Sequence, residues 1–248
     1  MFGLRLFSGF RILAYHSVPD IAITGIDVTK NDLELQFQYL KDNGYEVVSL
    51  REIQIGKLNP KYNIGNKIVL TFDDGYDDFL FNVIPLLKKY KYPATVYPIS
   101  NFVEHQDEGF DFESGKNKKS MNREQLFESS RCHLVNIGSH SAEHLDFSSI
   151  SSEIAQHEIA TSVAYLSKII KKPIVDFCYP WAKYNKQNML LVNEFFETAV
   201  IGKGGVNRRS SDFKALRRIP IKNGTLANFA NVIKLYTLPK DILRHYIK

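Results

Sequence analysis

Short apolar runs alternate along the chain with longer amphipathic stretches. Seven such runs occur, and most of them are apolar at consecutive positions. That pattern is typical of strands covered on both faces, as in parallel sheets. The predicted strands lie at residues 11–16, 67–72, 94–99, 133–138, 175–180, 198–202 and 217–221.

Helical periodicity fills most of the intervals between these runs. The clearest helix follows Ser151 and Ser152, where apolar residues recur on one stripe from Ile154 to Ile170 until Pro173 stops the pattern. Further helices are predicted at 32–44, 81–90, 185–196 and 225–236. This alternation predicts an α/β fold with a parallel sheet, open or closed into a barrel. Residues 104–121 are polar and aperiodic, which indicates a long loop.

Composition narrows the class of protein. The 248 residues are 44% hydrophobic and 24% charged, as in ordinary globular proteins, and α/β barrels of this length usually form a single domain. A net charge of +5 spread along the sequence, without basic blocks flanked by aromatics, argues against nucleic acid as a partner. The two cysteines, Cys132 and Cys178, suggest neither a disulfide framework nor a zinc ribbon.

Nothing in the pattern predicts a membrane span or a signal peptide. No stretch approaches the roughly 18 apolar residues of a spanning helix, and Arg5 and Arg11 interrupt the apolar start of the chain. We therefore expect a cytoplasmic protein. The basic amphipathic segments 1–11 and 232–248 fit two interpretations, namely peripheral contact with the inner membrane face and packing against the barrel.

Two carboxylates follow the predicted strand 67–72. Parallel α/β folds carry their chemistry at the carboxyl ends of strands, which is where Asp73 and Asp74 lie. Successive strand side chains point to opposite faces, so both can share one site only if the chain turns at once, and Gly75 permits that turn. A plain turn or helix cap is the alternative interpretation.

A second polar cluster follows the predicted strand 133–138. His140 and His144 have i, i+4 spacing, which would put both imidazoles on one side of a helical turn. Two imidazoles and one carboxylate suit Zn²⁺ or a similar transition metal and leave a coordination position open for water. The alternatives are two hydrogen-bonded loop histidines, or a Mg²⁺ site made by both aspartates as in phosphoryl transfer. The imidazoles favour Zn²⁺ or a similar transition metal over Mg²⁺.

These clusters resemble the motifs of the polysaccharide deacetylases, carbohydrate esterase family four with the NodB-homology fold. The segments TFDDG (71–75), SHSAEH (139–144) and FCYPWAKYN (177–185) resemble its three motifs, and LAYHSV (13–18) and LRRIPI (216–221) resemble a subgroup that modifies surface polysaccharides. The resemblance covers residues 12–221. It implies a distorted (β/α)7 barrel, one catalytic domain over residues 1–248, and N-acetylated sugars as substrates.

The resemblance also implies roles for individual residues. Asp73 would be the general base, and Asp74, His140 and His144 would form the metal site. The expected ion is divalent, with Zn²⁺ first and Co²⁺, Ni²⁺ or Mn²⁺ as alternatives. The backbone N–H of Trp181 would hold the developing oxyanion. The third-motif residues Tyr179, Pro180 and Trp181 are expected to contact substrate, although core packing also explains the tryptophan.

Three departures from the family pattern raise hypotheses. Many members carry an arginine that orients the base, and Cys178 stands in that place, so we hypothesise that Arg218 reaches the base instead. The later Asp-containing motif has only Asp212 as a candidate, which is better interpreted as a solvated loop residue. For the proton donor, His16 is a rival to His245, which lies in a Leu-x-His segment close to the end of the chain.

The sequence therefore predicts a metal-dependent carbohydrate N-deacetylase, a hydrolase of amide C–N bonds. Its substrate would be an N-acetylated aminosugar in a glycan or in a lipid-linked precursor. Three alternatives remain open at this point. They are a catalytically silent sugar-binding relative, a deformylase of a lipid-linked aminosugar, and a Mg²⁺ phosphohydrolase.

Overall fold

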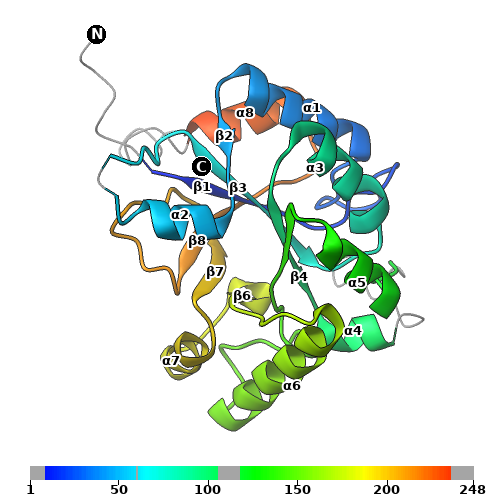
Figure 1. The fold of residues 1–248 in the computed structure, drawn as a ribbon, viewed down its shortest axis with the longest axis vertical. Helices are drawn as coiled ribbons and strands as arrows, with labels where there is room; N and C mark the ends of the chain where they lie inside the picture. Colours follow the sequence, from blue (N-terminus) through cyan, green and yellow to red (C-terminus); the bar gives the residue numbers. More distant parts are fainter. Residues whose placement is uncertain (1–8, 60, 106–117, 236–248) are drawn as a thin grey trace.

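Seven parallel strands form a nearly closed barrel in the order β5-β4-β3-β1-β8-β7-β6 (Figure 1). The computed structural model describes residues 9–59, 61–105 and 118–235. The barrel strands are β1 (Arg11–Tyr15), β3 (Lys67–Asp74), β4 (Ala94–Pro98), β5 (Val135–Ile137), β6 (Asp176–Cys178), β7 (Thr198–Lys203) and β8 (Leu216–Pro220). The short β2 (Glu46–Val47) pairs with the start of β3. The distorted (β/α)7 barrel predicted from sequence is confirmed.

The ring closes between β5 and β6 through residues just beyond β5. The backbone N–H of Ser139 donates to the carbonyl of Asp176, and the N–H of Cys178 donates to the carbonyl of Ser139, both at 2.9 Å. This single bridge between Ser139 and Phe177 replaces a full ladder. It also places the chain segment after β5 directly against the end of β6.

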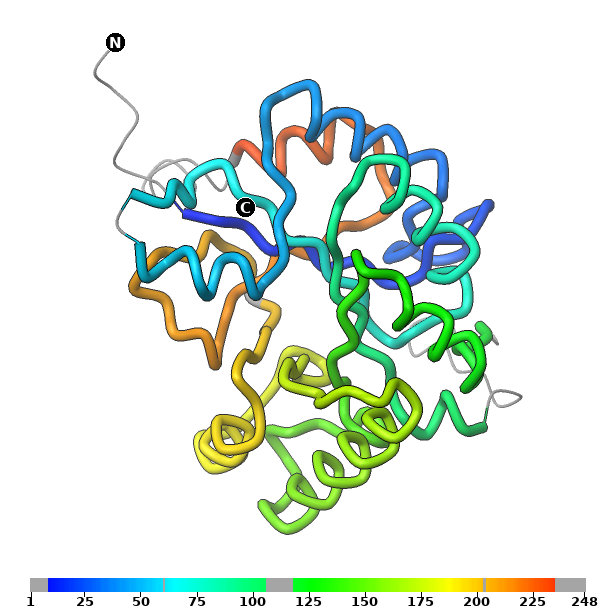
Figure 2. The backbone as a smooth tube through the Cα atoms, in the orientation of Figure 1, coloured from blue at the N-terminus to red at the C-terminus, as the bar shows by residue number. Residues whose placement is uncertain are grey.

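Helices surround the barrel (Figures 1 and 2). They are α1 (Lys30–Asp42), α2 (Leu50–Gly56), the π-helix η2 (Phe79–Val83), α3 (Ile84–Tyr90), α4 (Ser100–Glu104), α5 (Arg123–Arg131), α6 (Ser152–Ile170), the 3-10 turn η4 (Pro180–Ala182), α7 (Lys186–Phe195) and α8 (Leu226–Leu235). Figure 2 shows α8 lying beside α1, where the rings of Tyr39 and Phe229 meet edge to face. The barrel thus brings two segments from opposite ends of the chain together.

The long helix α6 begins and ends where the sequence predicts. Ser151 caps it by accepting a hydrogen bond from the N–H of Ile154, and Lys171 ends it in a left-handed conformation two residues before Pro173. The predicted stripe is buried at Ile159, Leu166 and Ile170, but not at its first position. Ile154 is exposed, and Ala155 is buried in its place. The helix is therefore rotated slightly relative to the expected apolar face.

Side chains inside the barrel change from apolar to polar along the strands. Alternate residues of a strand share a face, so Ile12 and His16 from the β1 segment point the same way, as do Val69 and Asp73 from β3. Ile12 and Val69 belong to a buried apolar cluster. His16 and Asp73, further along, line a pocket together with Arg218 from β8. The carboxyl end of the barrel is therefore its polar end.

The structure also shows elements that periodicity did not predict. These are β2, α2, α4 and α5, all of which are short. The predicted helix 81–90 divides into η2 and α3 at Ile84, where the following Pro85 lacks a backbone N–H. No helix in the described ranges is long and apolar enough to cross a bilayer. Most of the predicted loop 104–121 and of the basic terminal segments, including His245, lies outside the described residues.

Candidate active site

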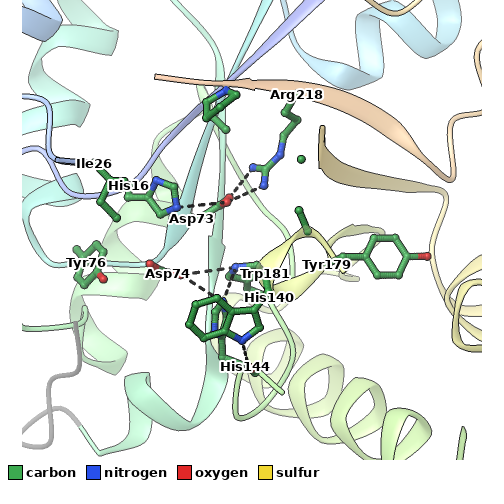
Figure 3. A pocket seen from close by; sticks show the side chains of 14 residues that line it. His16, Ile26, Asp73, Asp74, Tyr76, His140, His144, Tyr179, Trp181 and Arg218 are labelled. Carbon is green, nitrogen blue, oxygen red and sulfur yellow. Dashed lines mark hydrogen bonds and ion pairs between the residues drawn. The ribbon is translucent and has the colours of Figure 1, made fainter. Parts of the chain in front are cut away.

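A pocket of about 190 Å³ opens at the carboxyl end of the barrel (Figure 3). Its walls come from β1, β3, β7, β8 and the segments that follow the strands. The lining residues are Ala14, His16, Ile26, Asp73, Asp74, Tyr76, His140, His144, Tyr179, Trp181, Ala182, Gly202, Arg218 and Pro220. The polar residues from the three sequence clusters therefore share one cavity.

Asp73 and Asp74 enter the pocket because the chain turns at once. Asp74 itself is left-handed, with φ 66°, and Gly75 follows with φ 76°. A Cβ atom at Gly75 would lie 2.6 Å from the Cβ of Pro98, so only glycine fits this turn. Both aspartates are buried. The turn lets neighbouring carboxylates of one strand face the same cavity, as the sequence required.

The two histidines converge by a different route from the one predicted. Residues 139–144 are not helical, and Ser141 and His144 are left-handed, with φ values of 65° and 61°. The Ser141 hydroxyl accepts a hydrogen bond from the N–H of His144 at 3.0 Å and so stabilises the turn. The prediction of a helical turn is wrong, because tertiary contacts determine the backbone conformation of this loop. The imidazoles still meet, with ring centroids 4.7 Å apart.

Three donor atoms face a common point between the histidines and Asp74. The Nδ1–H of His140 donates to the carbonyl of Cys178 at 2.8 Å, which leaves Nε2 with its lone pair. The Nε2 atoms of His140 and His144 are 3.2 Å apart. Asp74 Oδ1 lies 3.6 Å from the Nε2 of His140 and 3.9 Å from that of His144.

These separations fit a metal ion. Ligand bonds of about 2.0 to 2.2 Å around a tetrahedral ion leave neighbouring donor atoms about 3.3 Å apart. Burial lowers the pKa of His144 to about 2, and the neighbouring His140 adds to this shift. His144 is therefore neutral and able to offer a lone pair. Asp74, His140 and His144 form the set that could hold a divalent cation.

Asp73 is held away from this set by Arg218. The guanidinium donates from Nη1 to Oδ1 at 2.6 Å and from Nη2 to Oδ2 at 2.7 Å, and both residues are buried. Burial by itself would raise the pKa of Asp73, but the charge and hydrogen bonds of Arg218 outweigh burial and hold that pKa well below its usual range. Asp73 is therefore a carboxylate with a fixed orientation.

Cys178 fills the space beside this ion pair. Its Sγ accepts a hydrogen bond from Arg218 Nη2 at 3.1 Å and lies 3.6 Å from Asp73 Oδ1. Burial raises the pKa of the thiol well above its usual value. Asp73, His140 and Cys178 also lie close enough to form a second possible ligand group. The guanidinium already neutralises Asp73 there, so a cation is favoured at the Asp74 set instead.

The sequence model of the polysaccharide deacetylase family matches residues 61–196, more than half of the chain. The chain belongs to the polysaccharide deacetylase family. Among curated relatives, Bacillus subtilis YxkH, provisionally named a polysaccharide deacetylase, is 26% identical over 214 residues, which cover 86% of this chain and 71% of the relative.

Two further matches concern named deacetylases. The poly-beta-1,6-N-acetyl-D-glucosamine N-deacetylase of Escherichia coli K12 is 31% identical over 138 residues, which cover 54% of this chain and only 20% of that enzyme. The solved structure of IcaB from Ammonifex degensii matches with a TM-score of 0.78 at 19% identity, covering 93% of this chain and 98% of IcaB. This likeness shows that the two proteins share one fold.

His16 approaches Asp73 from the side opposite to Arg218 (Figure 3). Its Nε2 lies 4.0 Å from Asp73 Oδ2, and the side chain is 25% exposed. Its buried Nδ1 has no hydrogen-bond partner among the described residues. His16 thus faces both the base candidate and the open pocket without belonging to the candidate metal-ligand set. His245, the other candidate proton donor, lies outside the described residues.

The third family motif forms the η4 turn at the pocket mouth. Trp181 is left-handed, with φ 57°, and 45% exposed. Its indole N–H donates to the carbonyl of His144 at 3.1 Å, and its ring lies 4.9 Å from the imidazole of His144. The tryptophan therefore supports the histidine loop and also leaves one face open at the entrance.

The neighbouring motif residues are arranged differently. The ring of Tyr179 points away from the aspartates (Figure 3) and packs against Phe177 and Tyr184. Pro180 is buried and is not among the residues that line the pocket. Tyr179 and Pro180 support the turn that carries Trp181. Asp212 is an exposed loop residue, as predicted, and is not among the residues that line the pocket.

One wall of the pocket was missed at the level of sequence. Ile26 and Tyr76 line the side opposite Trp181. The buried Asp27 pairs with Lys118 and so ties the loop that carries Ile26 to the segment in which Ser120 pairs with Tyr76. Tyr76 directly follows Gly75 of the first motif, and this position could have indicated that it lines the pocket. The sequence around Asp27 could not indicate its pairing, because its partner lies 91 residues away.

Proposed function

We propose that this protein is a metal-dependent hydrolase that removes the N-acetyl group from an N-acetylated aminosugar, in a poly- or oligosaccharide or its lipid-linked precursor. One observation carries the proposal. The donor atoms of Asp74, His140 and His144 converge within 3.2 to 3.9 Å of one another, beside a carboxylate that Arg218 keeps separate. Family membership supports the reaction class, and the name of the Escherichia coli relative supports an N-acetylglucosamine polymer as substrate.

Asp74, His140 and His144 would hold the ion, with Zn²⁺ preferred and Co²⁺, Ni²⁺ or Mn²⁺ able to replace it. When bound, such an ion lowers the pKa of a coordinated water towards about 7 and polarises a carbonyl oxygen. The two imidazoles distinguish this set from an all-oxygen Mg²⁺ site. For this reason the phosphohydrolase alternative is less well supported than the amidohydrolase.

Asp73 is assigned as the general base. It accepts the proton that water loses as its oxygen adds to the amide carbonyl carbon. The lowered pKa keeps the carboxylate ionised throughout the neutral range, and the two Arg218 hydrogen bonds fix its direction. Arg218 thereby supplies the guanidinium that many family members carry at the position of Cys178. That substitution argues for a catalytic protein rather than a silent sugar-binding relative.

His16 and Trp181 complete the proposed reaction. His16 donates a proton to the amine nitrogen as the C–N bond breaks, which yields acetate and a free aminosugar. The backbone N–H of Trp181 is assigned to the carbonyl oxygen as negative charge develops there. The exposed face of the Trp181 indole is assigned to a sugar ring at the entrance.

Acetate release tests this function. Protein treated with a chelator and then reloaded with Zn²⁺ is incubated with β-1,6-linked N-acetylglucosamine oligomers. We expect acetate from reloaded protein, none from the chelated protein, and none from Asp74→Asn. Asp212→Asn is the matched control, since Asp212 is exposed outside the pocket, and it should behave as wild type.

Other products would identify the alternatives. Formate from an N-formylated, lipid-linked aminosugar would indicate a deformylase. Phosphate release that persists in His140→Ala would indicate a Mg²⁺ phosphohydrolase. Oligomer binding by the reloaded protein without any acetate would indicate a silent relative, and each of these three results contradicts the proposed function.

A further inference from the structure

Helix α6 carries a glutamate on its buried face. Glu158 is 3% exposed, between the buried residues Ala155 and Ile159. Its Oε2 accepts hydrogen bonds from the backbone N–H groups of Ala142 at 3.1 Å and Glu143 at 2.9 Å. No lysine or arginine in the described residues pairs with it. A buried carboxylate is thus directed at the backbone between His140 and His144.

A serine one helical turn along α6 makes a second contact with the same loop. The hydroxyls of Ser162 and Ser139 are 2.7 Å apart, and the Ser139 hydroxyl accepts a hydrogen bond from the N–H of Ser141 at 3.2 Å. Glu158 and Ser162 have i, i+4 spacing and therefore lie on one face of the helix. Glu158 accepts directly from the backbone N–H groups of residues 142 and 143, and Ser162 reaches that of Ser141 through the Ser139 hydroxyl.

The loop needs such support because of its backbone conformation. Ser141 and His144 are both left-handed, although neither is glycine. Non-glycine residues keep this strained conformation only where the surroundings over-determine it. The N–H groups of Ala142 and Glu143 lie between the two strained residues and point at one acceptor, Glu158. Removing that acceptor leaves a buried N–H unpaired and lets the loop relax.

We propose that Glu158 is a positioning residue for the metal-binding loop. Its carboxylate holds residues 142 and 143 so that His140 and His144 direct their Nε2 atoms to one point. Glu158 acts through the backbone and touches neither substrate nor ion. This inference rests on the metal site of the proposed function. It adds that metal binding also requires a carboxylate on helix α6, outside the loop that carries the histidines.

Cobalt binding measures the effect without relying on turnover. Chelator-treated protein is titrated with Co²⁺, and the visible absorption of the bound ion gives the dissociation constant. We expect Glu158→Gln to weaken Co²⁺ binding several-fold, because a neutral amide oxygen accepts more weakly from the two backbone N–H groups than a carboxylate does. Glu158→Asp keeps the carboxylate on a shorter stem and should recover part of the loss. Glu153→Gln makes the same change at an exposed site on α6 and should match wild type.

Thermal unfolding of the metal-free proteins separates positioning from general stability. A lower unfolding temperature of Glu158→Gln together with an unchanged Co²⁺ dissociation constant would overturn the proposal. If Glu158→Gln does not fold, Glu158→Asp, whose carboxylate sits on a shorter stem, should still weaken Co²⁺ binding, and wild-type affinity in that variant then overturns the proposal. A folded wild type that binds no Co²⁺ refutes the metal site itself. Wild-type affinity in Glu158→Gln refutes only the role of Glu158.

Discussion

Arg218 and Asp73 form a buried, two-pronged ion pair although 145 residues separate them in the sequence. Arg218→Ala removes both donors while the burial that raises the pKa of Asp73 remains, so the carboxylate loses its fixed direction and part of its charge. We expect turnover to fall by about 10- to 100-fold or more while bound metal stays constant. Steady-state kinetics and elemental analysis of the same preparation measure the two quantities.

Two further variants serve as controls for Arg218. Arg218→Lys keeps a charge but loses the planar fork, so it should recover only part of the activity. Cys178→Ala leaves both Arg218 hydrogen bonds to Asp73 and should stay active. Loss of one partner of a buried pair also costs about 3–5 kcal/mol of stability, so folding is first verified by circular dichroism. Wild-type turnover in folded Arg218→Ala would show that the pair is not needed.

The adjacent aspartates should separate metal binding from catalysis. Asp73→Asn removes the base but none of the three converging donors, so turnover should drop by about 10² to 10⁴-fold with metal content unchanged. Asp74→Asn removes a donor, so metal content should fall together with activity. Elemental analysis after gel filtration compares both with wild type. The assignment of roles is reversed if Asp73→Asn loses the metal and Asp74→Asn keeps it.

Residue type and local order predicted a parallel α/β sheet and the polar residues at its carboxyl end, whereas closure into a barrel was implied by the resemblance to the deacetylase motifs. Asp73 and Asp74 come directly after an apolar run, and parallel strands direct their carboxyl ends to one edge, so their place in the pocket follows from the sequence. The same holds for His140 and His144. The short elements β2, α2, α4 and α5 could not be predicted, because a few residues carry too little periodicity.

What escaped prediction depends on contacts between distant segments. The left-handed His144 depends on the Ser141 hydroxyl, on Trp181 and on loop support from α6, none of which shows in local spacing. The position of Glu158 did carry a signal, since a charge stands among apolar residues of α6. That signal becomes readable only when the buried stripe is known to begin at Ala155 instead of Ile154.

Trp181 should show two separable functions. Trp181→Ala removes the exposed ring face and should raise the KM for N-acetylglucosamine oligomers about 5- to 10-fold, the equivalent of about 1 kcal/mol. Trp181→Phe keeps a ring and should recover most of the KM. It lacks the N–H that donates to His144, so Co²⁺ binding should weaken a few-fold. A KM equal to wild type in both variants would contradict contact between the ring and the sugar.

Asp78 connects the π-helix η2 to the segment that follows His16. Its Oδ2 accepts hydrogen bonds from the hydroxyl of Ser17 at 2.6 Å and the N–H of Val18 at 2.9 Å. The side-chain amide of Asn82 donates to the carbonyl of Val18 at 2.9 Å. The buried Oδ1 of Asp78 has no hydrogen-bond partner among the described residues. Asp78 therefore anchors the segment that carries His16, but with one oxygen unsatisfied.

Burial raises the pKa of Asp78 to about 6, against the hydrogen bonds from Ser17 and Val18 that lower it. A carboxyl group whose pKa is raised by folding contributes stability that is fully present below its unfolded value, near 3.9, and lost as the pH rises through 6. Asp78→Asn does not titrate. As the pH rises from about 5 to about 8, the unfolding free energy of wild type should therefore fall by about 1 kcal/mol relative to that of the variant. Urea unfolding of both proteins at the two pH values gives the difference in unfolding free energy between variant and wild type at each pH. The change in that difference is free of the titration of all other groups and of any constant effect of the amide. A difference that stays constant over this range would show that Asp78 does not titrate there.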